Sequence, residues 1–235
     1  MTPRTSDRRS SPPRRDQART RLARAAVIDA ARVLFLERGY GATTVEAISD
    51  RADVPPATVY RLFASKHGIL KSLLDVSIVG DHEHVPMADR PQIQALVDHP
   101  NPRQKLAGFV GITVRVNERI APLYRILVSA AGTDREAAGL LDELTRQRQR
   151  GQRTIARSLA RAGALRPELR ERDAADVIHA LMSPELYRLL VVDRAWNLHR
   201  YAGWLTCTLD HQLLCPVSEG GLEPPREKYP TSTSS

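Results

Sequence analysis

The chain has little cysteine and no long apolar segment. Its 235 residues include only Cys207 and Cys215, which are too few for a disulfide framework and lack the spacing of metal ligands. No apolar run reaches the length that spans a bilayer, and the arginine-rich start lacks the apolar core of a signal peptide. We therefore expect a soluble, cytoplasmic protein without a membrane partner, long enough to bury one or two cores.

The sequence also lacks the common signatures of enzymes. It contains no nucleophile elbow, no P-loop, no HExxH zinc motif and no glycine-rich dinucleotide fingerprint. The run DHEH at residues 81–84 offers metal-binding atoms, but it has no partner motif, and a polar loop is the favoured interpretation. We predict no catalytic residue, no metal and no cofactor.

Positive charge is concentrated at the start of the sequence. Residues 1–24 carry eight arginines and two aspartates, so +6 of the net charge of +8 lies there. Prolines and serines accompany these arginines, and we therefore expect residues 1–19 to be a disordered basic arm. Ahead of a DNA-binding domain, such an arm can follow the phosphate backbone or reach into the minor groove. A solvated tail is the alternative.

Residues 44–66 predict two short helices joined by a tight turn. Apolar residues at helical spacing form the first helix, and Thr44 precedes it as an N-cap. The segment DVP at 53–55 interrupts the pattern, and Pro56 suits the first position of a second helix. In that helix the larger apolar residues face inward and the small or polar ones outward. The pattern is that of a helix-turn-helix, whose second helix enters the major groove of DNA.

One helix is expected before this stretch and another after it. The preceding helix begins at about Thr20 and ends at Gly39, because glycine suits the position just past a helix end. Ser65 is the expected N-cap of the following helix, which carries a stripe of isoleucine and leucine. Residues 20–79 are therefore expected to form one DNA-binding domain of four helices.

Residues 27–74 carry an LF-x-E-x-GY-x-A-TT run, a T-x-Y-x-x-F helix and a Ser-Lys pair that opens the fourth helix. This segment resembles the N-terminal domain of TetR-type (tetracycline-repressor-like) bacterial transcriptional regulators. The resemblance implies an all-α homodimer whose N-terminal domain binds a palindromic operator and whose larger C-terminal domain binds a ligand that lowers operator affinity. Asp53 stands where members usually have glycine, but aspartate tolerates the left-handed conformation of such a turn better than most residues.

Three residues are candidate contacts to the DNA backbone, on their chemistry and on this resemblance. Thr44 begins a helix, where its hydroxyl and the free N–H groups nearby suit a phosphate. Lys66 offers a point charge to a phosphate, and Tyr60 offers a phenol that reaches the backbone. Their structural alternatives are an N-cap, a solvated lysine and an aromatic at the edge of the core.

Four residues of the second short helix are candidate contacts to the bases or beside them. Pro56, Ala57 and Thr58 are small enough to let the helix approach the floor of the major groove. There a methyl group can meet the thymine methyl, and a hydroxyl can meet a base edge. Arg61 suits either a guanine or a phosphate, and the sequence does not decide between them.

Residues 80–214 are expected to form a ligand-binding and dimerisation domain. The periodicity predicts a short helix near 92–98, helices at 103–117 and about 123–130, and a long helix at 134–162. An apolar pocket among such helices is the usual small-molecule site, although an aromatic residue or methionine on a helix is more often plain core. The candidate ligand contacts are Phe109, Tyr124, Leu127, His179 and Met182.

Two further helices are expected at 171–192, kinked at Pro184, and at 197–214. Their leucines recur three and four residues apart and suit a four-helix interface between two copies, or packing within one subunit. The candidate interface residues are Leu186, Leu190, Leu205 and Leu209. Residues 215–235 are rich in proline, glycine and serine and are expected to be a disordered tail.

The sequence therefore predicts an all-α protein: an N-terminal helix-turn-helix domain joined by a fourth helix to a larger helical ligand-binding and dimerisation domain. The predicted function is a ligand-responsive transcriptional regulator, chiefly a repressor, that binds double-stranded operator DNA as a homodimer and is released by a small-molecule effector. The alternative is a DNA-binding architectural protein without small-molecule control. No residue pattern identifies the effector.

Overall fold

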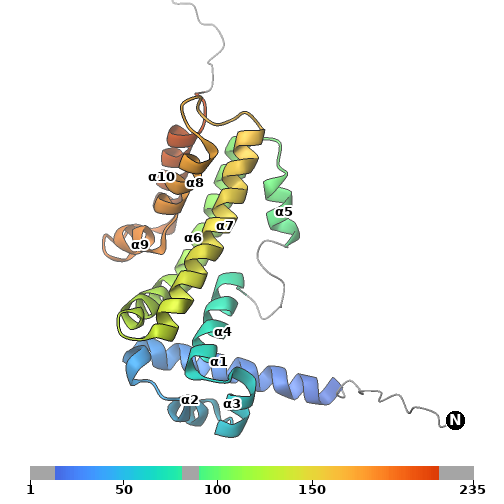
Figure 1. The fold of residues 1–235 in the computed structure, drawn as a ribbon, viewed down its shortest axis with the longest axis vertical. Coiled ribbons are helices and arrows are strands. Elements are labelled where there is room, and N and C mark those ends of the chain that lie inside the picture. The colour runs from blue at the N-terminus through green and yellow to red at the C-terminus, as the bar shows by residue number, and fades with distance from the viewer. Residues whose placement is uncertain (1–13, 81–89, 217–235) are drawn as a thin grey trace, which may run out of the picture.

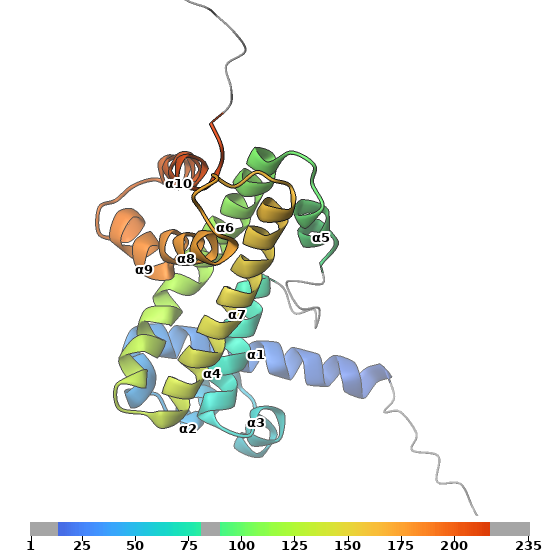
Figure 2. The same cartoon turned by 45° about the horizontal axis from the view of Figure 1, so that its top comes forward.

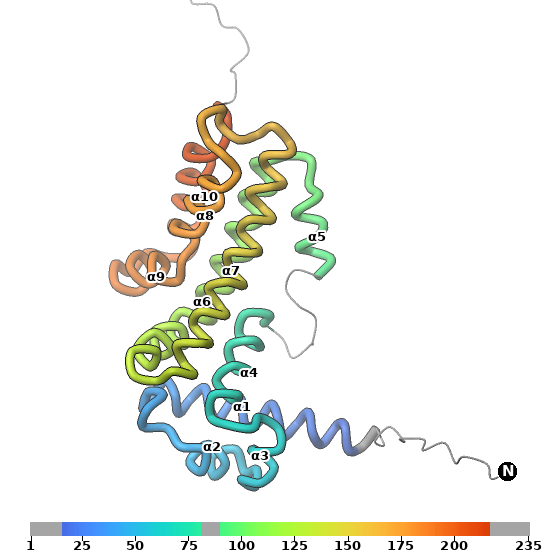
Figure 3. Tube along the Cα trace, in the orientation of Figure 1, coloured from blue at the N-terminus to red at the C-terminus, as the bar shows by residue number. Residues whose placement is uncertain are grey.

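The computed structural model describes residues 14–80 and 90–216, and every regular element within these ranges is a helix. Four helices lie at one end, two long helices run side by side through the middle, and the last helices lie along the other end (Figures 1 and 3). The predicted all-α class is confirmed. The DHEH run and most of the predicted arm and tail lie outside the described residues. No helix in the described ranges is both long and apolar enough to cross a membrane.

The first four helices form the helix-turn-helix domain. They are α1 (Arg14–Ala42), α2 (Val45–Ala52), α3 (Pro56–Phe63) and α4 (Lys66–Val79). Helix α1 is broken at Gly39, which has φ +77°, as the sequence predicted. It begins at Arg14 rather than near Thr20, so the last residues of the predicted arm are helical. Their alanine, arginines and glutamine are good helix formers.

The core of this domain is shared with the two long helices. Phe35 of α1, Ile48 of α2 and Val59 of α3 are fully buried in one cluster with leucines of α4. The same cluster takes in Leu127 of α6 and Leu140 of α7. The four-helix DNA-binding domain predicted at residues 20–79 implies a core closed by those four helices alone. The structure instead completes that core with the ends of α6 and α7.

The remaining elements build the second domain. They are α5 (Pro91–Val97), α6 (Pro102–Ala131), α7 (Arg135–Arg161), α8 (Glu171–Leu181), α9 (Pro184–Tyr187), the π-helix η2 (Arg188–Val192) and α10 (Leu198–Leu213). Helices α5, α7 and α10 match the predicted ranges. The predicted helix at 171–192 is interrupted at Ser183, which caps α9 by accepting a hydrogen bond from the Leu186 N–H. The proline at 184 thus ends one helix and starts the next.

The prediction of two helices at 103–117 and 123–130 was wrong, because α6 is one helix with Pro122 inside it. A proline in a helix leaves the carbonyl four residues earlier without its donor. Here Pro122 and Glu118 are both exposed, so water can satisfy that carbonyl. The neighbouring Ile120 and Leu123 are buried and anchor both sides of the proline.

Two of the predicted interface leucines lie in the core of a single subunit. Leu205 and Leu209 have no exposed surface and belong to the second core, together with residues of α6, α7 and α8. They are therefore unavailable to a second copy, and their assignment to a dimer interface was wrong. Periodicity identified the buried face of α10 but not the surface that covers it. Leu186 and Leu190 are partly exposed and remain candidates.

Candidate nucleic-acid interface

The turn between α2 and α3 is fixed by local hydrogen bonds. Thr44 caps α2 by accepting from the Ala47 N–H at 3.1 Å, as predicted. Asp53 has φ 52° and ψ 43°, the left-handed conformation that the turn requires. The buried Ser49 hydroxyl donates to the Val54 carbonyl at 2.5 Å and ties the end of α2 to the turn. These bonds set the direction in which α3 leaves the turn.

Helix α3 presents small side chains to solvent. Pro56 occupies its first turn without a side-chain cap, as the sequence predicted. Val59 and Phe63 are buried against the domain, whereas Pro56 and Ala57 are exposed and Thr58 is half-buried. No large side chain stands on this part of the helix, which suits close approach to the floor of a major groove.

Tyr60 and Arg61 extend this exposed surface. The Tyr60 side chain is 46% exposed, so it is not a residue of the core edge. Its hydroxyl lies 3.4 Å from the Glu46 carboxylate on α2, a long contact that leaves the phenol available to another partner. Arg61 is exposed on the same helix. The Thr44 oxygen accepts the hydrogen bond that caps α2. Its O–H donates to no partner among the described residues and is free to donate elsewhere.

Lys66 has a structural role that the sequence did not predict. Its ammonium donates to the carbonyls of Tyr40 at 2.8 Å and Thr43 at 3.0 Å, and it lies 4.3 Å from the centre of the Tyr40 ring. These bonds tie the start of α4 to the end of α1 and to the residue that follows it. Because an ammonium has three N–H groups, one is left for a phosphate.

We expect Lys66→Ala to lower the free energy of unfolding by about 2–3 kcal/mol, since two charge-assisted hydrogen bonds are lost. Urea denaturation measures this. Lys71→Ala is the matched control: Lys71 pairs with Glu143 in an exposed salt bridge, and its removal should cost about 0–1 kcal/mol. Equal stabilities for wild type and Lys66→Ala would show that the two carbonyl contacts contribute nothing.

The predicted ligand contacts do not form one site. Leu127 is fully buried in the core shared with the helix-turn-helix domain. Phe109 and Met182 belong to the second core. Tyr124 and His179 belong to a polar network where α6, α7, α8 and α9 meet.

That network links four helices. The Tyr124 hydroxyl of α6 donates to the Glu185 carboxylate of α9 at 2.8 Å, and burial followed by this bond raises the pKa of Tyr124 to about 12. His179 Nδ1 of α8 lies 2.7 Å from the Gln152 side-chain oxygen of α7. Burial and then the nearby Arg148 guanidinium lower the pKa of His179 and so favour the neutral imidazole. Sequence reasoning missed Gln152, Glu185 and Arg148, because no local pattern marks their partners.

Tyr124→Phe is expected to lower the free energy of unfolding by about 1 kcal/mol, because a partly buried hydrogen bond to a carboxylate is lost. Tyr60→Phe removes the same hydroxyl from an exposed and longer Tyr–Glu contact, so it should leave stability unchanged. Thermal denaturation of both variants gives the comparison. If the Tyr124→Phe protein is as stable as the wild type, the hydrogen bond between Tyr124 and Glu185 does not stabilise the fold.

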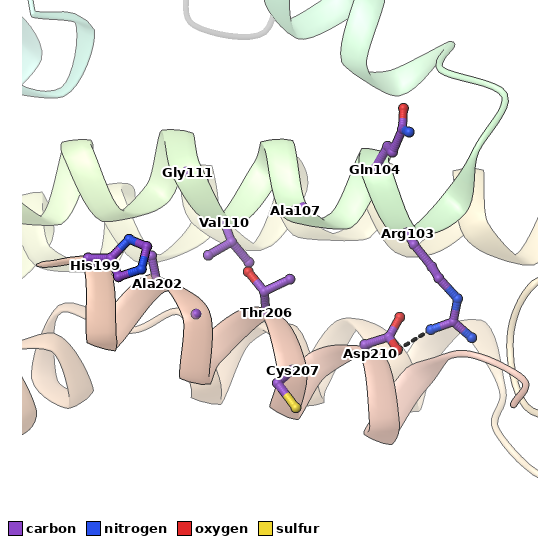
Figure 4. A pocket seen from close by; sticks show the side chains of 11 residues that line it. Arg103, Gln104, Ala107, Val110, Gly111, His199, Ala202, Thr206, Cys207 and Asp210 are labelled. Carbon is purple, nitrogen blue, oxygen red and sulfur yellow. Dashed lines mark hydrogen bonds and ion pairs between the residues drawn. The ribbon is translucent and has the colours of Figure 1, made fainter. Parts of the chain in front are cut away.

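A groove of about 630 Å³ lies between α6 and α10, away from these candidates. Figure 4 shows Val110 and Gly111 of α6 opposite Ala202 and Thr206 of α10, with the ion pair of Arg103 and Asp210 at one end. None of the predicted ligand contacts lines it. Its small residues were not singled out from the sequence, since they carry no chemical signature.

The fold and the exposed face of α3 define a helix-turn-helix DNA-binding regulator. Residues 27–73 match the family model of bacterial regulatory proteins of the tetR family. The uncharacterized HTH-type transcriptional regulator YdeS of Bacillus subtilis (strain 168) is 29% identical over 168 residues, 71% of this chain and 77% of the relative. These matches show a TetR-type N-terminal domain in a chain that is similar to a transcriptional regulator over most of its length.

One further curated protein and one solved structure are similar to this chain. The HTH-type transcriptional repressor BdcR of Escherichia coli (strain K12) is 35% identical over 83 residues, 33% of this chain and 41% of the relative. The solved complex of SmeT with triclosan superposes with a TM-score of 0.65 at 19% identity, over 90% of this chain and 99% of that chain. SmeT is described as the repressor of a multidrug efflux pump of Stenotrophomonas maltophilia. At this identity the structural match supports the fold alone.

Proposed function

We propose that the protein is a repressor that binds a palindromic operator as a homodimer in the cytoplasm and is released by a small molecule. The observation that carries this proposal is the surface of α3, where Pro56 and Ala57 are exposed on a helix held from behind by Val59 and Phe63. Such a surface has no function inside one subunit. Its size and its small side chains suit the major groove.

Effector control is supported by the way α4 is held. The guanidinium of Arg119 on α6 donates to the carbonyls of Ser77 at 2.7 Å and Ile78 at 3.0 Å and thereby caps the end of α4. Lys71 of α4 pairs with Glu143 of α7 at 2.5 Å. A ligand that moves α6 relative to α7 would therefore move α4, and with it the helix-turn-helix. The neighbouring SmeT structure holds triclosan, which makes apolar aromatic compounds the first effectors to test.

A second copy is proposed to bind at an apolar face of η2. Leu189 and Val192 are 47% and 61% exposed and lie three residues apart on this helix. The partly exposed Leu190 follows Leu189 directly, and the partly exposed Leu186 lies three residues before it. Neighbouring exposed apolar side chains of this size are typical of a contact surface. Pairing there replaces the interface through Leu205 and Leu209 that the sequence suggested.

Footprinting on the DNA that flanks the protein's own gene tests the proposal, followed by a screen for compounds that release the bound protein. The proposal expects protection of a palindrome and loss of protection with at least one apolar compound. A tight palindrome that responds to no compound would favour the architectural protein instead. Absence of any specific protection in this region, and of enrichment from a randomised DNA pool, would contradict both.

A further inference from the structure

A second groove lies on the helix-turn-helix domain, beside α3. It has a volume of about 830 Å³ and is bounded by the first turns of α1, the turn before α3 and one side of α3. Figure 2 shows α1 continuing past α3 and away from the body of the domain. The charged and polar residues that matter here are Asp16, Arg19, Arg21, Asp53, Thr58 and Arg61.

The arginines of this groove have no partners in the part of the chain that the structure describes. Arg19, Arg21 and Arg61 make no hydrogen bond or ion pair with any residue in the ranges 14–80 and 90–216. Arg24, one turn further along α1, shows the contrast: its guanidinium donates to the Leu62 carbonyl at 3.2 Å and the Ser72 hydroxyl at 2.9 Å. Arg24 holds the domain together, whereas the other three guanidinium groups are available to an external anion.

The positions of these arginines on α1 and α3 place positive charge on both walls of the groove. Two residues advance an α-helix by about 200°, so Arg19 and Arg21 lie at opposite edges of the α1 face that borders the groove. Thr58 and Arg61 lie three residues apart on α3 and therefore share the side that faces α1. Cations thus stand on both walls, next to the candidate base contacts of α3.

We propose that this groove holds the sugar-phosphate backbone beside the operator half-site, with Arg19, Arg21 and Arg61 as phosphate contacts. The inference rests on the proposed DNA-binding function. A helix seated in the major groove has a phosphate backbone along each side, and α1 projects over one of these sides. Arg61 then contacts a phosphate and not a guanine. The carboxylate of Asp16, on the same wall of the groove as Arg19 and Arg21, repels the phosphates and lowers the affinity of the groove for the DNA backbone.

The test compares the salt dependence of binding to two probes, a random-sequence duplex and a duplex selected by the wild-type protein from a randomised pool. Each of Arg19→Gln, Arg21→Gln and Arg61→Gln should lower the slope of log K against log salt by about 1, equally for both probes. The sequence selected from the pool should stay the same. Asp16→Asn should bind both probes more tightly at low salt.

The control is Arg153→Gln, which removes an exposed arginine of α7 beside the second core and should change neither slope nor affinity. If the double variant Arg19→Gln with Arg21→Gln keeps the wild-type slope while the wild type binds its selected duplex, the groove is not a backbone site and the proposed function stands. A changed consensus for Arg61→Gln would overturn its assignment to a phosphate. A wild type that binds neither probe would overturn the proposed function and this inference with it.

Discussion

Replacing Leu205 and Leu209 together by glutamate is expected to unfold the second domain. Both side chains are fully buried, one turn apart on α10. Truncating one buried leucine costs about 3–5 kcal/mol, and burying a carboxylate without a partner adds the loss of its hydration. A domain stable by about 5–15 kcal/mol cannot absorb two such changes. Circular dichroism should show a large loss of helix at temperatures where the wild type is folded.

The loss should extend to the helix-turn-helix domain, because α6 and α7 complete its core. His199→Glu with Gln212→Glu is the control, since it places the same two carboxylates on exposed residues of α10. That protein should keep the wild-type helix content. A Leu205→Glu, Leu209→Glu protein with wild-type helix content and melting temperature would contradict the burial of α10 described above.

Replacing Leu189 and Val192 together by glutamate should give folded monomers with weak operator binding. Both residues are exposed within one subunit, so the substitutions should change stability by less than about 1 kcal/mol. A dimer that places two α3 helices on one operator binds with about 10²–10⁴-fold higher apparent affinity than a single helix does, and a monomer loses this gain. Light scattering and a titration with the selected duplex measure the two effects.

The control for this variant is Val128→Glu, which alters an exposed apolar residue of α6 on the part of the helix that packs with the DNA-binding domain. It should remain a dimer with normal affinity. A Leu189→Glu, Val192→Glu protein that is still a dimer and binds its operator normally would eliminate the η2 surface as the interface.

The features that local chemistry determines were predictable from the sequence. The Thr44 cap, the left-handed Asp53, the first-turn Pro56 and the break at Gly39 each depend on a few neighbouring residues. The helix-turn-helix could be predicted for this reason, because it consists of caps and turns in a fixed order. The resemblance over residues 27–74 added the family.

The features that depend on distant partners were not predictable. Lys66 bonds to carbonyls 23 and 26 residues away, and Tyr124 bonds to a carboxylate 61 residues away. From the sequence alone Pro122 predicts the end of a helix, because its exposure to water is known only once the packing of α6 is known. The leucine stripe of α10 gave the right periodicity but not the identity of the surface that covers it. In each case the missing information was which elements pack together.

The most direct test of the central claim, that α3 reads an operator as part of a dimer, is selection of bound duplexes from a randomised pool by wild type and Thr58→Ala. The wild type should select a palindrome whose half-sites are centred about 34–36 Å apart, or a multiple of this spacing. Thr58→Ala should select a palindrome with the same spacing but altered bases within each half-site. Failure of the wild type to enrich any sequence, or an identical consensus from both proteins, would contradict the account.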